Sequence, residues 1–90
     1  MRFPSIPLTM TPREILNELK WRDDRDLAKA RVWYGHRGVE RGYVVISGAE
    51  ITELERGYFT TVQARIPFYK IFRIEYEGEV IFERHPEGNP

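Results

Sequence analysis

The chain has 90 residues, with 14 lysines and arginines against 14 aspartates and glutamates, no cysteine, and 41% hydrophobic residues. This length allows one domain with a thin core and excludes two. The absence of cysteine excludes disulfides and thiolate metal sites and is typical of a reducing compartment. The zero net charge argues against a general nucleic-acid coat protein, because such proteins use a large basic excess.

The sequence pattern also predicts neither a membrane span nor a signal peptide. Apolar runs such as Val44 to Ile46 are too short to span a membrane, and the start of the chain, with Pro4 and Pro7, lacks the apolar stretch of a signal peptide. We therefore expect a cytoplasmic protein. Arginine dominates the basic residues and only three amides occur, so the composition predicts a thermophilic source; the amides are Asn17, Gln63 and Asn89.

The first predicted element is a helix. Residues 1–10 show no periodicity and are expected to form an arm. Thr11 to Glu14 then form a capping box with proline at the first helical position. Because the next apolar residues share one face, the pattern predicts an amphipathic helix over 12–20; they are Ile15, Leu16 and Leu19. Trp21 is expected to follow as a buried anchor, and residues 22–26 as a charged, solvated turn.

Alternating apolar residues predict strands after this turn. One is expected over 30–34 and ends at the glycine-rich segment 35–38, and a second is expected over 43–47. Residues 48–57 are ambiguous, because Ser47 to Glu50 is a second capping-box pattern that favours one or two helical turns.

The second half of the chain predicts further strands. These cover 58–64, then 72–76 and 79–84, with Pro67 opening a turn through Ile71. Glu77-Gly78 is a two-residue hairpin signature. The aromatic residues of the last hairpin are expected in the core; they are Phe72, Tyr76 and Phe82. Residues 85–90 form a polar tail. The predicted class is α+β: one domain over 1–90, with a short N-terminal helix packed on a small, mostly antiparallel sheet that ends in a C-terminal β-hairpin.

The first candidate site is the segment from Gly35 to Gly38. The two glycines let backbone N–H groups approach a ligand, Arg37 offers a planar fork for phosphate oxygens, and His36 can donate from either nitrogen. The alternative is a glycine-rich turn with two exposed side chains.

The second candidate is the segment 65–73, where cations alternate with aromatic residues and no acidic residue occurs. Such a pattern can stack bases and hold phosphates. The alternative is that Phe68 and Phe72 belong to the core and the cations are solvated.

Enzyme and metal sites are poorly supported. His36 and His85 are far apart and lack the spacing of a metal site, and we expect no metal or cofactor. Neither histidine begins the His-x-Ser/Thr motif of two-histidine phosphoesterases, and no phosphate-binding loop or nucleophile elbow occurs. Acid and base catalysis on a phosphate needs paired groups, so no catalytic residue is expected.

Several short motifs in order support a family resemblance. They are Lys20-Trp21, His36-Arg37-Gly38, Ser47-Gly48-x-Glu50-Ile51, the run from Ile66 to Ile71 and the closing run from Tyr76 to Arg84. Together they resemble the small archaeal proteins of the RNA cyclic group end recognition domain family, over about residues 12–84. The resemblance implies recognition of RNA ends that carry a 2′,3′-cyclic phosphate, in RNA processing or repair.

The resemblance also implies particular site residues. His36 and Arg37 match the family's His/Asp-Arg-Gly element, whereas the Ile-Pro-Tyr-His-Arg-Ile element is altered here: Tyr69 stands where histidine is usual, and Lys70 where arginine is usual. A phenol still forms hydrogen bonds, and lysine keeps the charge but loses the bidentate fork. The expected RNA-end-binding residues are therefore His36, Arg37, Gly38, Tyr69, Lys70 and Arg73.

The leading hypothesis is thus a non-enzymatic domain that binds RNA 3′ ends. A protein-interaction subunit of a larger RNA-processing assembly is the alternative, which the neutral charge and small size would also explain. An RNA-end hydrolase that uses His36 is a third hypothesis.

Overall fold

The computed structural model describes residues 10–38 and 40–84. The expected arm, apart from Met10, and the expected tail lie outside these residues. In chain order the elements are α1 (Pro12–Trp21), η1 (Leu27–Lys29), β1 (Ala30–Gly35), β2 (Tyr43–Ser47), η2 (Gly48–Glu50), β3 (Glu53–Leu54), β4 (Tyr58–Thr60), β5 (Arg65–Pro67), η3 (Phe68–Lys70), β6 (Ile71–Tyr76) and β7 (Glu79–Glu83), where η marks a 3₁₀ turn. The α+β class is confirmed.

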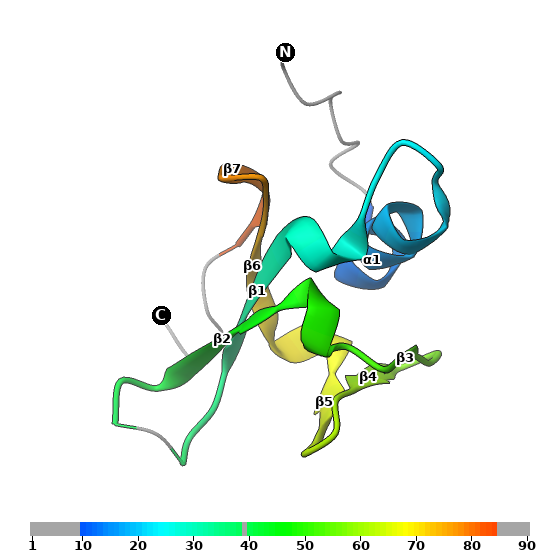
Figure 1. Ribbon diagram of the computed structural model, residues 1–90. Coiled ribbons are helices and arrows are strands. Elements are labelled where there is room, and N and C mark those ends of the chain that lie inside the picture. The colour runs from blue at the N-terminus through cyan, green and yellow to red at the C-terminus, as the bar shows by residue number, and fades with distance from the viewer. Residues whose placement is uncertain (1–9, 39, 85–90) are drawn as a thin grey trace.

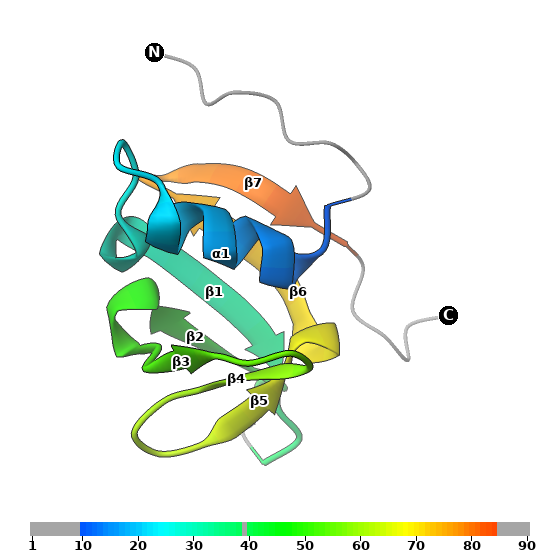
Figure 2. The ribbon, with the colours of Figure 1, turned by 90° about the vertical axis from the view of Figure 1, so that its right-hand side faces the viewer.

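The helix α1 begins as its capping box predicts. The Thr11 hydroxyl accepts the backbone N–H of Glu14, and the Glu14 carboxylate accepts the backbone N–H of Thr11. Ile15, Leu16 and Leu19 are buried and face the sheet. Figure 2 shows α1 lying across one face of the strands.

Trp21 was wrongly expected in the core. It is 71% exposed, and the Lys20 ammonium lies 5.0 Å from the centre of its ring. Because 100° separates successive helical residues, position 21 falls on the face opposite Ile15 and Leu19. Helical periodicity therefore outweighs the general tendency of tryptophan to be buried.

Two antiparallel sheets build the rest of the domain (Figure 1). The larger has the strand order β2-β1-β6-β7, and the smaller has the order β3-β4-β5. The buried cluster comes from α1, the inner face of the larger sheet and the smaller sheet; its members with no more than 2% exposure include Ile15, Leu16, Leu19, Val32, Phe59, Ile71 and Ile74. The sheets thus enclose a small core.

The last hairpin forms as predicted. Glu77 has φ of 50° and Gly78 has φ of 87°, so both residues lie in the left-handed region that a tight two-residue turn needs. Tyr76 pairs with Glu79 across this turn.

In the middle of the chain one strand is shorter than expected, and two short strands, β3 and β5, were not predicted. Ser47 caps a single 3₁₀ turn, and the strand expected over 58–64 ends at Thr60. The Thr61 hydroxyl accepts the backbone N–H groups of Gln63 and Ala64, which turns the chain into β5. The 3₁₀ turn η3 then follows Pro67, where a turn was predicted.

A β-bulge reverses the expected direction of one aromatic side chain. Tyr34 pairs with Ile71 and Trp33 pairs with Arg73, so Phe72 is the extra residue in β6. Ile71 and Ile74 are consequently both buried, while Phe72 is half-buried and is not among the residues packed on the core. The expectation that Phe72 belongs to the core was wrong.

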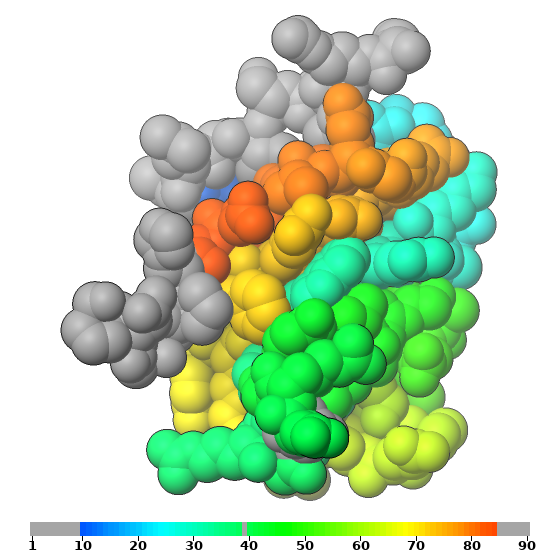
Figure 3. Space-filling model, turned by 90° about the vertical axis from the view of Figure 1, so that its left-hand side faces the viewer, coloured from blue at the N-terminus to red at the C-terminus, as the bar shows by residue number. Residues whose placement is uncertain are grey.

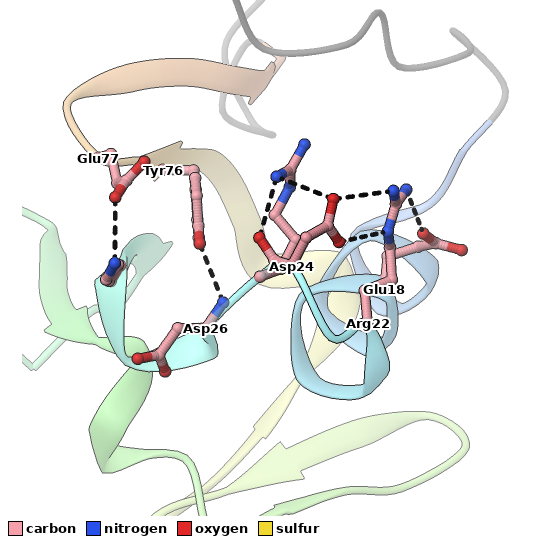
Figure 4. A network of polar contacts seen from close by, with 8 residues as sticks. Glu18, Arg22, Asp24, Asp26, Tyr76 and Glu77 are labelled. Carbon is pink, nitrogen blue, oxygen red and sulfur yellow. Dashed lines mark hydrogen bonds and ion pairs between the residues drawn. The ribbon is translucent and has the colours of Figure 1, made fainter. Parts of the chain in front are cut away.

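Ion pairs hold the connection between α1 and β1 (Figure 4). Arg22 binds Asp24 through two nitrogens, at 3.1 and 3.2 Å, and reaches Glu18 at 3.4 Å. The Tyr76 hydroxyl accepts the backbone N–H of Asp26 at 2.9 Å, and Lys29 pairs with Glu77. The charged turn that was expected here is therefore ordered by its own charges.

Candidate functional site

The β1–β2 connection presents His36 in a defined orientation. The backbone N–H of His36 donates to the Gly42 carbonyl at 2.9 Å, which closes the loop, and the Nδ1 atom of His36 accepts the backbone N–H of Gly38 at 2.9 Å. Because Nδ1 is the acceptor, the neutral ring carries its hydrogen on Nε2. His36 is exposed, so the loop offers one oriented N–H donor to solvent.

Gly38 is required for this arrangement. A Cβ atom at position 38 would lie 2.9 Å from Cε1 and 3.3 Å from Nδ1 of His36. The imidazole would have to move away from any side chain there. We expected Gly38 to let the backbone approach a ligand. In the structure it lets the backbone approach the His36 ring.

A row of aromatic rings connects the His36 ring to the core. The His36 ring stacks on Tyr34, with 6.4 Å between the ring centres, and Tyr34 meets Phe59 edge-on at 6.0 Å. Phe59 in turn lies 5.8 Å from Phe68, the first residue of η3. Burial, with a smaller contribution from Glu50, raises the pKa of the Tyr34 hydroxyl, so this support is uncharged at neutral pH.

The second candidate element, η3, exposes two polar side chains. Phe68 is buried, whereas Tyr69 is 69% exposed and Lys70 is also exposed. The backbone N–H of Phe68 donates to the Gly57 carbonyl at 3.1 Å, which fixes the start of the turn against the β3–β4 connection. Tyr69 and Lys70 therefore project from a well-held backbone.

Arg84 holds the other side of η3 and was missed as a positioning residue. Its guanidinium donates to the Ile71 carbonyl at 2.9 Å and to the Tyr69 carbonyl at 2.6 Å. The same guanidinium lies 5.5 Å from the centre of the Phe82 ring. Its place at the end of the closing sequence motif was a signal of importance, but its partners are 13 and 15 positions earlier and only the fold brings them near.

The two elements lie at the same end of the larger sheet. Tyr34 pairs with Ile71 in antiparallel register, so the chain beyond Gly35 and the chain before Ile71 leave the sheet at the same end. Figure 3 shows the surface of the β1–β2 connection beside that of the start of β6. The fold thus brings His36, Arg37 and Gly38 to the same end as Tyr69 and Lys70.

The exposed cations at this end differ from Arg73, another expected site residue, in their ion pairing. Arg37, Arg41 and Lys70 are exposed and form no ion pair within residues 10–38 and 40–84. Arg73 lies farther along the sheet, where it bonds Glu75 at 2.8 Å and approaches Glu83 at 3.8 Å. Its charge is already balanced, so Arg73 is poorly suited to hold a phosphate.

Metal and membrane sites receive no support from the described part of the chain. No group of three or more histidine, aspartate or glutamate side chains there is arranged to hold a metal ion. His85 lies outside the described residues. No helix among them is both long and apolar enough to cross a bilayer.

Comparison with known proteins assigns the family. The model of the MJ1316 RNA cyclic group end recognition domain matches residues 4–84. The chain is 40% identical over 48 residues to the UPF0248 protein MK0350 of Methanopyrus kandleri, covering 53% of this chain and 65% of that protein. It is 30% identical over 70 residues to a UPF0248 protein of Archaeoglobus fulgidus, covering 77% of this chain and 99% of that protein.

No solved structure matches the chain significantly. The family assignment therefore comes from sequence and agrees with the resemblance drawn from the ordered motifs. The chain belongs to the MJ1316 RNA cyclic group end recognition domain family.

Proposed function

We propose that this domain binds RNA 3′ ends that carry a 2′,3′-cyclic phosphate and leaves them intact. The observation that carries the proposal is the oriented Nε2–H of His36, held by the Gly38 backbone beside Arg37 and at the same sheet end as Lys70. The description of the family, which refers to RNA cyclic end recognition, supports it.

The chemistry of the ligand suits this set of donors. A cyclic phosphate is a diester with two free oxygens and one negative charge, so it needs few cations but several hydrogen-bond donors. Arg37 would bind the two oxygens with its planar fork, and the Nε2–H of His36 would donate to one of them. Lys70 would add positive charge, and the Tyr69 hydroxyl would donate a further hydrogen bond. This explains RNA binding by a chain of zero net charge.

The same geometry supports the proposal of binding without cleavage. Opening the cyclic phosphate requires one group to activate water and another to protonate the leaving oxygen. The Nδ1 atom of His36 already accepts the Gly38 N–H, and no other histidine occurs in the described residues. A single imidazole with one free nitrogen serves such a reaction poorly, which favours recognition over hydrolysis.

The test compares one RNA sequence with three different 3′ ends: a 2′,3′-cyclic phosphate, a 3′-phosphate and free hydroxyls. We expect the tightest binding for the cyclic end, and we expect binding to weaken as salt rises. Arg37→Ala should reduce affinity for the cyclic end at least tenfold, since a hydrogen bond to a charged group contributes about 1.5–3 kcal/mol.

Lys20→Ala is the matched control, because it removes one exposed positive charge from the end of α1. It should leave affinity nearly unchanged. Mass spectrometry of the cyclic-ended RNA after hours of incubation should show no ring opening. Equal affinity for the three ends would contradict the proposal and favour the protein-interaction subunit, and ring opening that requires His36 would establish the hydrolase instead.

A further inference from the structure

The larger sheet has one face that no other described element covers. Figure 3 shows β7, β6, β1 and β2 as successive bands at this surface, whereas α1 packs on the opposite face (Figure 2). Four large apolar side chains of these strands are half-buried but do not pack against the core: Trp33, Tyr43, Val45 and Phe72. Trp33 lies between Val45 and Arg73 in register, which places these side chains on the uncovered face. We call this surface the open face.

Two aromatic rings of the open face meet near Gly35. Tyr43 pairs with Gly35, and the Tyr43 ring meets the Phe72 ring edge-on, with 5.9 Å between their centres. A Cβ atom at Gly35 would meet only the Gly42 carbonyl oxygen, at 4.0 Å. The two rings therefore form one aromatic pair at the end of the open face nearest the β1–β2 connection.

Arginine guanidinium groups lie over two of these rings. The Arg73 guanidinium is 4.9 Å from the centre of the Trp33 ring, and the Arg41 guanidinium is 5.2 Å from that of Tyr43. Because Glu75 and Glu83 balance the charge of Arg73, this group offers a planar surface for stacking and not a free charge for phosphate. Arg41 has no ion-pair partner within the described residues and is available to a phosphate.

Aromatic rings and guanidinium planes on an exposed sheet are the groups on which single-stranded RNA bases stack. The open face also continues from the proposed end-binding site, because Tyr43 follows the β1–β2 connection and Phe72 follows η3. We propose that the open face binds the single-stranded nucleotides that precede the RNA end by stacking their bases. This inference rests on the proposed function, since it assumes that the end itself lies at His36 and Arg37.

The geometry suggests an order for these nucleotides. The nucleotide next to the end would stack on the Tyr43–Phe72 pair, near Gly35. The following base would lie on the Arg73–Trp33 pair, two positions and about 6.6 Å farther along the sheet. The open face would then read single-stranded RNA with little regard to sequence, because every base has a stacking face.

The experiment measures how affinity depends on RNA length at a constant end. The probes are a mononucleotide, a trinucleotide and a hexanucleotide that all end in a 2′,3′-cyclic phosphate, and a trinucleotide with free hydroxyls. We expect the trinucleotide to bind at least tenfold more tightly than the mononucleotide, because stacking one base on an aromatic group contributes about tenfold or more. The hexanucleotide should add little.

Tyr43→Ala is the decisive variant. Tyr43 is half-buried and lies outside the core cluster, so the fold should be kept. The change should remove one stacking ring, reduce the gain from mononucleotide to trinucleotide, and leave mononucleotide affinity unchanged. Trp33 is also half-buried and outside the core cluster, and Trp33→Ala provides a second variant with the same expected result. Trp21→Ala, which removes an exposed aromatic ring at the end of α1, is the matched control and should keep the full gain.

Fluorescence gives an independent readout. In a Trp21→Phe background, emission comes from Trp33 alone, and the trinucleotide should quench it while the mononucleotide should not. Equal affinities for the two lengths, or a length gain that survives both Tyr43→Ala and Trp33→Ala, would overturn the inference. The same holds if these variants change only self-association, because the open face would then be a protein interface. Equal affinity for the cyclic-ended and the hydroxyl-ended trinucleotide, together with a retained length gain, would contradict the proposed function but not the stacking face.

Discussion

Two charge-rich regions of this domain use their charges in opposite ways. In the connection from α1 to β1, Arg22 pairs with both Asp24 and Glu18, and Lys29 pairs with Glu77 (Figure 4). At the end formed by the β1–β2 connection and η3, the exposed cations Arg37, Arg41 and Lys70 have no ion-pair partner among the described residues. A run of charged residues in the sequence does not show whether they form a structural network or a binding surface. The ion-pair partners of each residue in the structure show this.

The two regions also differ in what supports them. The first is held mainly by exposed ion pairs, which contribute little each. The second is supported by buried aromatic rings and by two hydrogen bonds that the Arg84 guanidinium donates to backbone carbonyls. Unpaired charges are therefore displayed on the more firmly supported region, which suits a site that must hold a ligand in one geometry.

Removing the aromatic support should have the largest effect. Phe59 is fully buried and contacts both Tyr34 and Phe68. Phe59→Ala should lower the free energy of unfolding by about 3–5 kcal/mol, as cavity-forming substitutions of this size do. Chemical denaturation measures this change. Trp21→Ala, by contrast, should lower it by less than about 1 kcal/mol, because Trp21 is exposed; similar losses for the two variants would contradict the assigned core.

Restoring the residues usual in the family at positions 69 and 70 should raise the affinity for cyclic-ended RNA. Tyr69→His together with Lys70→Arg adds a donor that can become cationic and a bidentate fork. Affinity for cyclic-ended RNA should rise by about 1.5–2 kcal/mol, the low end of what one hydrogen bond to a charged group contributes. Titration calorimetry with cyclic-ended and hydroxyl-ended RNA gives the comparison. A change in thermal stability without a change in affinity would show that η3 has a structural role only.

Disturbing the orientation of His36 should have a smaller effect. Gly38→Ala forces the imidazole away from the backbone, because the new Cβ atom would lie 2.9 Å from Cε1. We expect a loss of about 1 kcal/mol in binding of the cyclic end, since one neutral hydrogen bond is misplaced. Shifts of the His36 ring signals in NMR spectra would report the displacement. Gly57→Ala is the control, because a Cβ atom there has open space; an equal loss in both variants would argue against an oriented histidine.

Acid should weaken the paired region around Asp24. Hydrogen bonds from Arg22 hold the pKa of the Asp24 carboxyl below its ordinary value. A carboxyl with a lowered pKa stabilises the folded state above its ordinary pKa, and this contribution disappears as the pH falls through the folded value.

Thermal denaturation from pH 7 down to about pH 3 tests this point, because the ordinary pKa of aspartate lies near 4. Asp24→Asn should be slightly less stable than the parent at neutral pH, and the difference should shrink in acid. Asp23→Asn, next to it but without an ion pair in the described residues, should show no such convergence. RNA affinity should be unchanged in both.

The sequence by itself determined the elements that depend on neighbouring residues. The capping boxes at Thr11 and Ser47, the hairpin turn at Glu77-Gly78 and the alternation in β1 act within a few positions, so each is visible in a short window. The order of several such motifs was also enough to indicate the family. The predicted strand over 58–64 failed in part because the Thr61 turn is stabilised by a side chain that strand propensity ignores.

Only the tertiary structure decided which of these residues act together. The bulge at Phe72 arises from the pairing of β6 with β1, and it turns an expected core residue onto the open face. Arg84 and its carbonyl partners, and the balance of Arg73 by Glu83, join residues that are distant in the chain. Propensity and spacing describe a residue's neighbours along the chain, whereas pairing register and packing choose its partners in space. For that reason the candidate residues could be named from the sequence, but the division between a paired Arg73 and an unpaired Arg37 could not.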